Sequence, residues 1–173
     1  DNASSRGLGD VYKRQVEYDY AGNQTVKSRN YYNLEIDGTS TSHVKSVAND
    51  FTIDNNLTVS STSAFDALAR TITVTGASDV NGILNIDGSG ILDANGAFDA
   101  TSGSITMDGT ARLQVGGTVT SLGTLDELAG TVEYDGSSSQ NIYNANYYDL
   151  TINNSFGVNL IGATSVNENL NLS

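Results

Sequence analysis

The side chains of this sequence that could bind a metal ion are aspartates standing directly before glycines. Carboxylate oxygens are hard ligands of the kind that Ca²⁺ prefers, and aspartates that recur through a repeated fold could form a ladder of calcium sites along one edge. These candidates are Asp37, Asp87, Asp108 and Asp135. The glycine-rich nonapeptide of calcium-binding β-rolls is absent, and Asp-Gly suits any tight turn. We therefore expect turn formation and no cofactor, with calcium as the alternative.

Carboxylates can also act in pairs, as they do in glycoside hydrolysis. Asp66, Asp99 and Asp126 occupy the same place in three similar segments. Residues repeated in this way are typical of positions that shape a fold, whereas an active site is normally unique. His43 is the single histidine and the chain has no cysteine, so thiol chemistry and cysteine-ligated zinc are excluded. We expect no catalytic residue and no enzymatic activity.

Two tyrosines are candidates for contact with a glycan or another surface. Alternation of Tyr32, Leu34 and Ile36 predicts that these three side chains face the core, which places Tyr31 outward. The same reasoning places Tyr147 outward in a second, similar segment. An exposed aromatic ring flanked by Asn or Asp offers an apolar platform with a hydrogen-bonding rim, which suits sugars.

The elements that would position these residues belong to a repeat. Val16-Glu17-Tyr18-Asp19 returns 116 residues later as Val132-Glu133-Tyr134-Asp135, and the match continues to Ile36 and Ile152. After one loop shortens by three residues, the offset becomes 113, as from Leu57 to Leu170. Shorter echoes are spaced by 33, 27 and 21 residues. A fixed long period with variable short periods is typical of a solenoid in a tandem array. We expect residues 16–131 to be one full unit and 132–173 to begin the next.

The local pattern predicts an all-β fold. Apolar residues alternate over short stretches such as Ile105 to Met107, between Asp-Gly, Asn-Gly and Gly-Gly pairs. The one stretch with helix-like spacing runs from Ala64 to Arg70. We predict a parallel β-helix, or β-solenoid, with tandem immunoglobulin-like β-sandwiches as the alternative. The short inner periods and the absence of proline favour the β-helix, because proline cannot donate to a strand ladder.

Composition excludes several classes of partner. The formal net charge is −12, which argues against nucleic acid and anionic membrane surfaces, since both require clustered Lys and Arg. No apolar run approaches the roughly 20 residues of a membrane-spanning helix, so we expect no membrane insertion in this segment. High negative charge is typical of an exposed, soluble protein surface.

The first fifteen residues do not follow the repeat. The stretch from Ser5 to Gln15 resembles the translation of a transposase-type sequencing adapter. At the 116-residue offset it should echo Ser121 to Thr131, and it does not. We therefore expect residues 1–15 to be a non-native, adapter-derived tail that takes no part in the fold, and the chain to be a segment of a longer array.

Residues Val16 to Ser173 resemble the β-repeats of very large secreted surface proteins of Bacteroidota-type bacteria. The resemblance rests on Val132-Glu133-Tyr134-Asp135-Gly136-Ser137, on the Tyr-Tyr-Asp-Leu-Thr-Ile-Asn-Asn run that ends at Asn154, and on Val166 to Leu172. It implies a non-catalytic structural or adhesive segment of an extracellular, cell-surface protein. Its partners would be neighbouring repeats of the same chain, surface glycans or other cells. Two alternatives are a non-catalytic part of a polysaccharide-processing β-helix enzyme and a phage tail-fibre segment.

Overall fold

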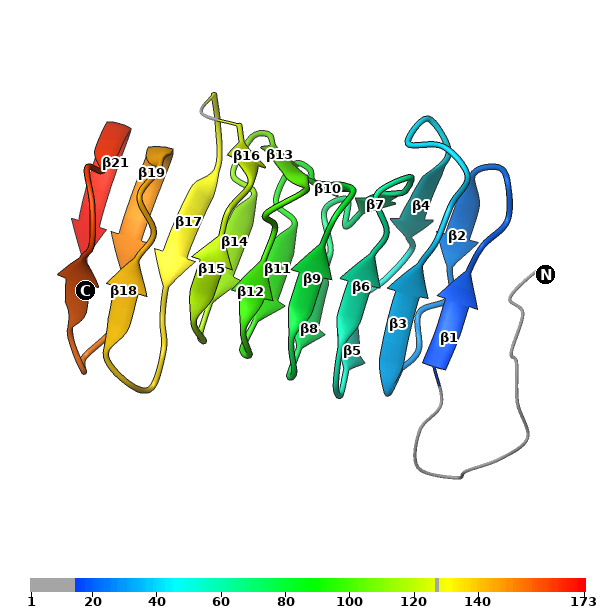
Figure 1. Cartoon of the computed structure of the whole chain (residues 1–173), viewed down its shortest axis with the longest axis horizontal. Coiled ribbons are helices and arrows are strands. Elements are labelled where there is room, and N and C mark those ends of the chain that lie inside the picture. Colours follow the sequence, from blue (N-terminus) through cyan, green and yellow to red (C-terminus); the bar gives the residue numbers. More distant parts are fainter. Residues whose placement is uncertain (1–14, 127) are drawn as a thin grey trace.

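The computed structural model describes residues 15–126 and 128–173. Over these residues the protein is a parallel β-solenoid of about eight turns without a helix, which confirms the predicted fold class. The coils follow one another along the long axis, with β1 at one end and β21 at the other (Figure 1). The sandwich alternative is wrong, because every strand pair described is parallel, whereas a sandwich is built from antiparallel sheets. Of the expected tail, residues 1–14 lie outside the described part, and Gln15 begins β1.

Three parallel sheets form the faces of the solenoid. The first sheet contains, in spatial order, β1 (Gln15–Tyr18), β3 (Asn33–Ile36), β6 (Leu57–Val59), β9 (Ser78–Val80), β12 (Phe98–Asp99) and β15 (Val119–Ser121). The second contains β2 (Gln24–Val26), β4 (Val44–Val47), β7 (Ala64–Asp66), β10 (Ile83–Ile86), β13 (Ser104–Met107) and β16 (Thr124–Leu125). The third contains β5 (Phe51–Ile53), β8 (Thr71–Val74), β11 (Ile91–Ala94), β14 (Arg112–Val115), β17 (Thr131–Tyr134), β19 (Asn146–Ile152) and β21 (Ser165–Leu172). A separate two-stranded sheet joins β18 (Gln140–Ile142) and β20 (Val158–Leu160).

One coil is about 21 residues long. Ile83 pairs with Ser104 and Ile91 pairs with Arg112, each 21 positions further along the chain. The echo of 21 residues in the sequence is therefore the coil itself. The spacings of 33 and 27 residues have another origin, because Phe98 lies on the first sheet while Phe65 and Leu125 lie on the second. These two spacings join similar strands on different faces.

The core is made of columns of apolar side chains that run from coil to coil. Consecutive strand pairs on the third sheet align one such column, and its members are at most 3% exposed: Ile72, Leu92, Leu113, Val132 and Leu150. Full burial of such a side chain contributes about 1.5–3 kcal/mol. Residues at the intervening positions face outward, as alternation in a strand requires. The alternation read from the sequence is confirmed on this sheet.

Glycines form columns at the corners where the chain passes between sheets. A Cβ atom on Gly96 would overlap the carbonyl oxygen of Gly76 on the preceding coil, and a Cβ atom on Gly117 would overlap that of Gly96. The backbones of successive coils approach so closely here that only glycine fits. The segment with helix-like spacing is also a corner: it consists of β7 and a turn in which Leu68 has a φ of 48°.

The two copies of the 116-residue repeat lie on different faces. Strand β1 belongs to the first sheet, whereas its sequence equivalent β17 belongs to the third. The same change relates β3 to β19 and β6 to β21. The offset is therefore not a whole number of coils, and the second copy is displaced by one face of the solenoid.

Candidate functional site

The four calcium candidates do not line one edge, so the expectation of a single ladder is wrong. Asp37 follows β3 on the first sheet, and Asp135 follows β17 on the third. Only Asp87 and Asp108 are neighbours, because they follow Ile86 and Met107, which pair on the second sheet. Each aspartate marks the end of its strand, as expected for a turn former, but the strands belong to three different faces.

Asp87 and Asp108 form an acidic column together with Asp66. Burial raises the pKa of Asp87, and the charges of Asp66 and Asp108 raise it further. Two of the carboxylates are engaged by backbone: Asp66 Oδ1 accepts a hydrogen bond from the Leu68 N–H at 2.7 Å, and Asp108 Oδ1 accepts one from the Gly88 N–H. Among residues 15–126 and 128–173, no group of three or more His, Cys, Asp or Glu side chains could hold a metal ion. Turn formation accounts for these contacts, and calcium binding stays a prediction to be tested.

The prediction that Tyr31 and Tyr147 face solvent is wrong. Tyr31 is 3% exposed and Tyr147 is fully buried. In the first copy, the chain bends at Tyr32 before β3 begins, which resets the alternation and leaves Tyr32 41% exposed. In the second copy, the register of β19 shifts between Tyr147 and Asp149, so two consecutive residues lie between inward side chains. A bulge of this kind reverses the face of everything before it.

The buried tyrosines belong to a hydrogen-bond network that occurs twice. In the second copy, the Tyr143 N–H donates to the Tyr134 hydroxyl at 3.0 Å, that hydroxyl lies 3.1 Å from the Tyr147 hydroxyl, and the latter donates to the Tyr143 carbonyl at 2.6 Å. Both backbone groups of one residue are thereby satisfied by two side chains. Burial raises the pKa of the Tyr134 and Tyr147 hydroxyls, which keeps them protonated and able to donate.

The first copy contains the same network 116 residues earlier. The Lys27 N–H donates to the Tyr18 hydroxyl at 2.9 Å, the Tyr18 and Tyr31 hydroxyls are 2.9 Å apart, and the Tyr31 hydroxyl donates to the Lys27 carbonyl at 2.5 Å. The position shared by Lys27 and Tyr143 contributes only its backbone, which explains why its side chain differs between the copies. The conserved-looking tyrosines of the repeat therefore stabilise a turn.

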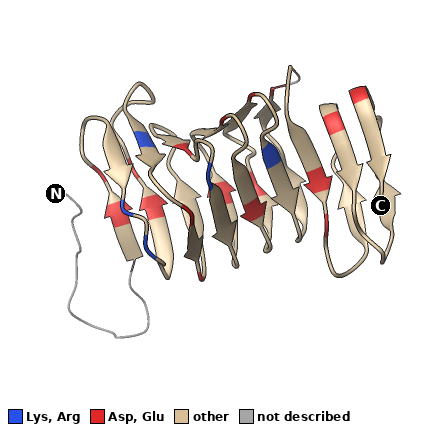
Figure 2. Cartoon of the chain, turned by 180° about the vertical axis from the view of Figure 1, so that it is seen from behind, with Lys and Arg blue, Asp and Glu red and all other residues tan. Residues whose placement is uncertain are grey.

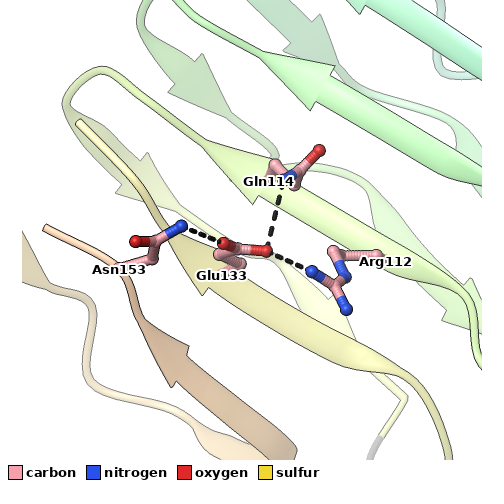
Figure 3. A network of polar contacts seen from close by, with 4 residues as sticks. All are labelled: Arg112, Gln114, Glu133 and Asn153. Carbon is pink, nitrogen blue, oxygen red and sulfur yellow. Dashed lines mark hydrogen bonds and ion pairs between the residues drawn. The ribbon is translucent and has the colours of Figure 1, made fainter. Parts of the chain in front are cut away.

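A second polar network surrounds Glu133, which is 3% exposed although it occupies an outward position (Figure 3). Its carboxylate accepts hydrogen bonds from Arg112 Nη1 at 2.6 Å, Gln114 Nε2 at 3.2 Å and Asn153 Nδ2 at 2.9 Å. The donors come from the coil before Glu133 and from the turn after β19. A buried carboxylate needs such donors to offset its lost hydration. The network ties together three successive coils.

Sequence reasoning also missed a buried lysine. Lys45 lies at an inward position of β4, and its Nζ donates to the carbonyl oxygens of Tyr20 and Gly22, both at 2.6 Å. Burial lowers the pKa of its ammonium group, and the charge of Asp19 opposes that effect. In the second copy, the Asn154 amide donates to the carbonyl of Ser138, the equivalent of Gly22. Both side chains satisfy the same loop, and no signal in the sequence pointed to this role.

The surface carries little positive charge. Acidic side chains are distributed along the solenoid, while the basic ones are few and separated (Figure 2). His43 lies in the loop before β4, and its N–H donates to the Ser40 carbonyl at 3.0 Å. None of the residues 15–126 and 128–173 forms a helix long and apolar enough to cross a bilayer. The apolar side chains that remain exposed include Tyr20, Tyr32, Leu128 and several residues of the last coil.

Comparison with known proteins yields no relative. No family model matches the chain, and neither a curated protein nor a solved structure matches it. The functional argument therefore rests on the fold and on the residues described above.

Proposed function

We propose that this chain is a non-catalytic structural and adhesive segment of a large extracellular bacterial surface protein. The observation that supports the proposal is the unbroken stack of about eight coils with one continuous core. Each coil is stabilised by its neighbours, so further coils lengthen the solenoid without new design. At about 4.8 Å per coil, eight coils extend roughly 38 Å. Such a segment acts as a stiff spacer that carries contact surfaces away from a cell.

The polar groups that look chemical in the sequence are accounted for by the fold. The aspartates before glycines end strands, the repeated tyrosines close a turn, and Glu133 joins neighbouring coils. Residues that the repeat reproduces serve the repeat. This supports a role without catalysis in the segment.

Tyr32 is the residue through which we propose adhesive contact. Its ring is 41% exposed, and the neighbouring Asn33 and Asn55 side chains are held together by a hydrogen bond of 2.8 Å. An exposed ring beside ordered amides fits the flat apolar face and hydroxyl rim of a sugar. The proposed ligand is a neutral glycan, because the net charge of −12 repels acidic ones.

Binding to a glycan array tests the adhesive role. We expect retention of the wild-type chain on neutral glycans and loss of that retention in Tyr32→Ala. Leu128→Ala, which changes another exposed apolar residue, should bind as wild type does. Absence of binding to every glycan, or binding that Tyr32→Ala leaves intact, would exclude this contact. Small-angle scattering from the same samples reports the rod shape independently.

A further inference from the structure

The last coil exposes apolar side chains beside an open strand edge. Leu160 in β20 is 69% exposed, and Leu170 and Leu172 in β21 are 57% and 76% exposed. Strand β21 pairs with β19 on one side, and within the described residues its other side has no strand partner. An open edge with adjoining apolar surface is a site where another strand binds.

The first copy of the repeat shows what covers these positions. The 113-residue offset relates Leu170 and Leu172 to Leu57 and Val59, both fully buried in β6. They are buried because β9 on the following coil pairs with β6. The natural cover of this surface is therefore another coil, stacked in parallel.

The opposite end of the chain offers a matching strand. Strand β1 pairs with β3 on one side, and within the described residues its other side has no strand partner. Its equivalent in the second copy, β17, is covered on that side by β14, which sets Leu113 against Val132 and Val115 against Tyr134. A strand of the β14 type is thus the preceding neighbour that a β1-type strand accepts.

Strand β21 has the pattern of β14. Leu170-Asn171-Leu172 repeats the apolar–amide–apolar order of Leu113-Gln114-Val115. The Gln114 amide donates to the Glu133 carboxylate at 3.2 Å. Glu17 occupies the position of Glu133 in the first copy, so Asn171 placed beside it would supply the same donor. The two ends are therefore complementary in apolar pattern and in hydrogen bonding.

We propose that the C-terminal coil of one chain binds the N-terminal coil of a second copy, with β21 and β1 parallel. Val16 then lies opposite Leu170, Glu17 opposite Asn171, and Tyr18 opposite Leu172. The contact is heterologous and leaves one free end on each side, so copies add head to tail into an open linear polymer. It goes beyond the spacer and adhesive role and does not depend on it. Because each copy carries a net charge of −12, salt strengthens the association.

Sedimentation velocity of the full chain over a range of concentrations tests this association. We expect the average mass to increase with concentration without stopping at a dimer, and to increase further at about 0.5 M NaCl, where charge repulsion is screened. Leu170→Lys/Leu172→Lys removes two exposed side chains and should weaken association at least about tenfold. Leu128→Lys, a matched change at an 80% exposed leucine elsewhere, should have no effect. Circular dichroism confirms that each variant is folded.

Disulfide trapping tests the register, since the chain has no native cysteine. Neighbouring parallel strands bring opposed Cα atoms within the range that a disulfide spans. A mixture of Glu17→Cys and Asn171→Cys chains should form a cross-linked heterodimer under mild oxidation, whereas Glu17→Cys with Asn159→Cys should not. A monomer at every concentration overturns the proposal. So does a dimer that stops growing, or association that the Lys variant leaves unchanged.

Discussion

Replacing Tyr134 with phenylalanine removes one oxygen atom from a buried hydrogen-bond network. That hydroxyl accepts the Tyr143 N–H at 3.0 Å and lies 3.1 Å from the Tyr147 hydroxyl. Tyr134 is fully buried, so water does not replace the lost group. The phenylalanine ring fills the same volume apart from the oxygen, and the expected effect is therefore polar in origin.

The magnitude follows from the groups left without partners. A buried N–H that loses its acceptor costs about 1–3 kcal/mol, and here the Tyr147 hydroxyl loses a neighbour as well. We expect Tyr134→Phe to lower the free energy of unfolding by about 2 kcal/mol. For a chain of this size that corresponds to a fall in Tm of roughly 4–8 °C.

Thermal and urea unfolding followed by circular dichroism measure this loss. Tyr32→Phe serves as the control, because the ring of Tyr32 is 41% exposed, and it should change stability by less than about 0.5 kcal/mol. Tyr147→Phe should cost a similar amount to Tyr134→Phe, and the double variant should cost less than the sum, because both hydroxyls act in one network. Equal stability of Tyr134→Phe and Tyr32→Phe, or full additivity in the double variant, would refute the reasoning.

Four further outcomes are expected. Glu133→Ala should lower the unfolding free energy in urea by about 1–3 kcal/mol, because three donors lose their acceptor. Gly96→Ala should cost a similar amount, since its Cβ would overlap backbone, whereas Gly38→Ala meets only ordinary contacts and should cost little. Millimolar Ca²⁺ should leave the Tm unchanged relative to EDTA if the aspartates before glycines only form turns; a rise in Tm would establish calcium binding. The Tm should rise as pH falls from 7 toward the ordinary aspartate pKa of 3.8, and a fall would contradict the shifts. Burial raises the pKa of three aspartates, so that the folded state binds protons more readily than the unfolded state: Asp66, Asp87 and Asp135.

Much of the fold could be predicted from local sequence. Alternating apolar residues separated by Asp-Gly and Gly-Gly pairs lead to short strands and tight corners, and the stacked strands of the third sheet follow that alternation. The echo between Ile86 and Met107 is the true coil length, because these residues pair directly. Such features are local, since alternation and corner chemistry depend on a few consecutive residues.

The site residues were harder to predict, because their exposure depends on single irregularities. One bend at Tyr32 and one register shift after Tyr147 reverse the predicted orientation of Tyr31 and Tyr147. A period of two has no tolerance for one extra residue. Glu133 and Lys45 were missed for another reason: their partners lie on neighbouring coils or in a loop about 20 residues away.

The sequence by itself determined that this protein is built from β-strands, glycine corners and a 116-residue repeat, because each of these is written in residue type and spacing. Only the tertiary structure decided on which face each strand lies. That choice depends on the summed lengths of all intervening loops, and a change of a few residues passes a strand to the next face. For this reason β1 and β17, nearly identical in sequence, occupy the first and third sheets, and the two ends of the chain acquire complementary edges.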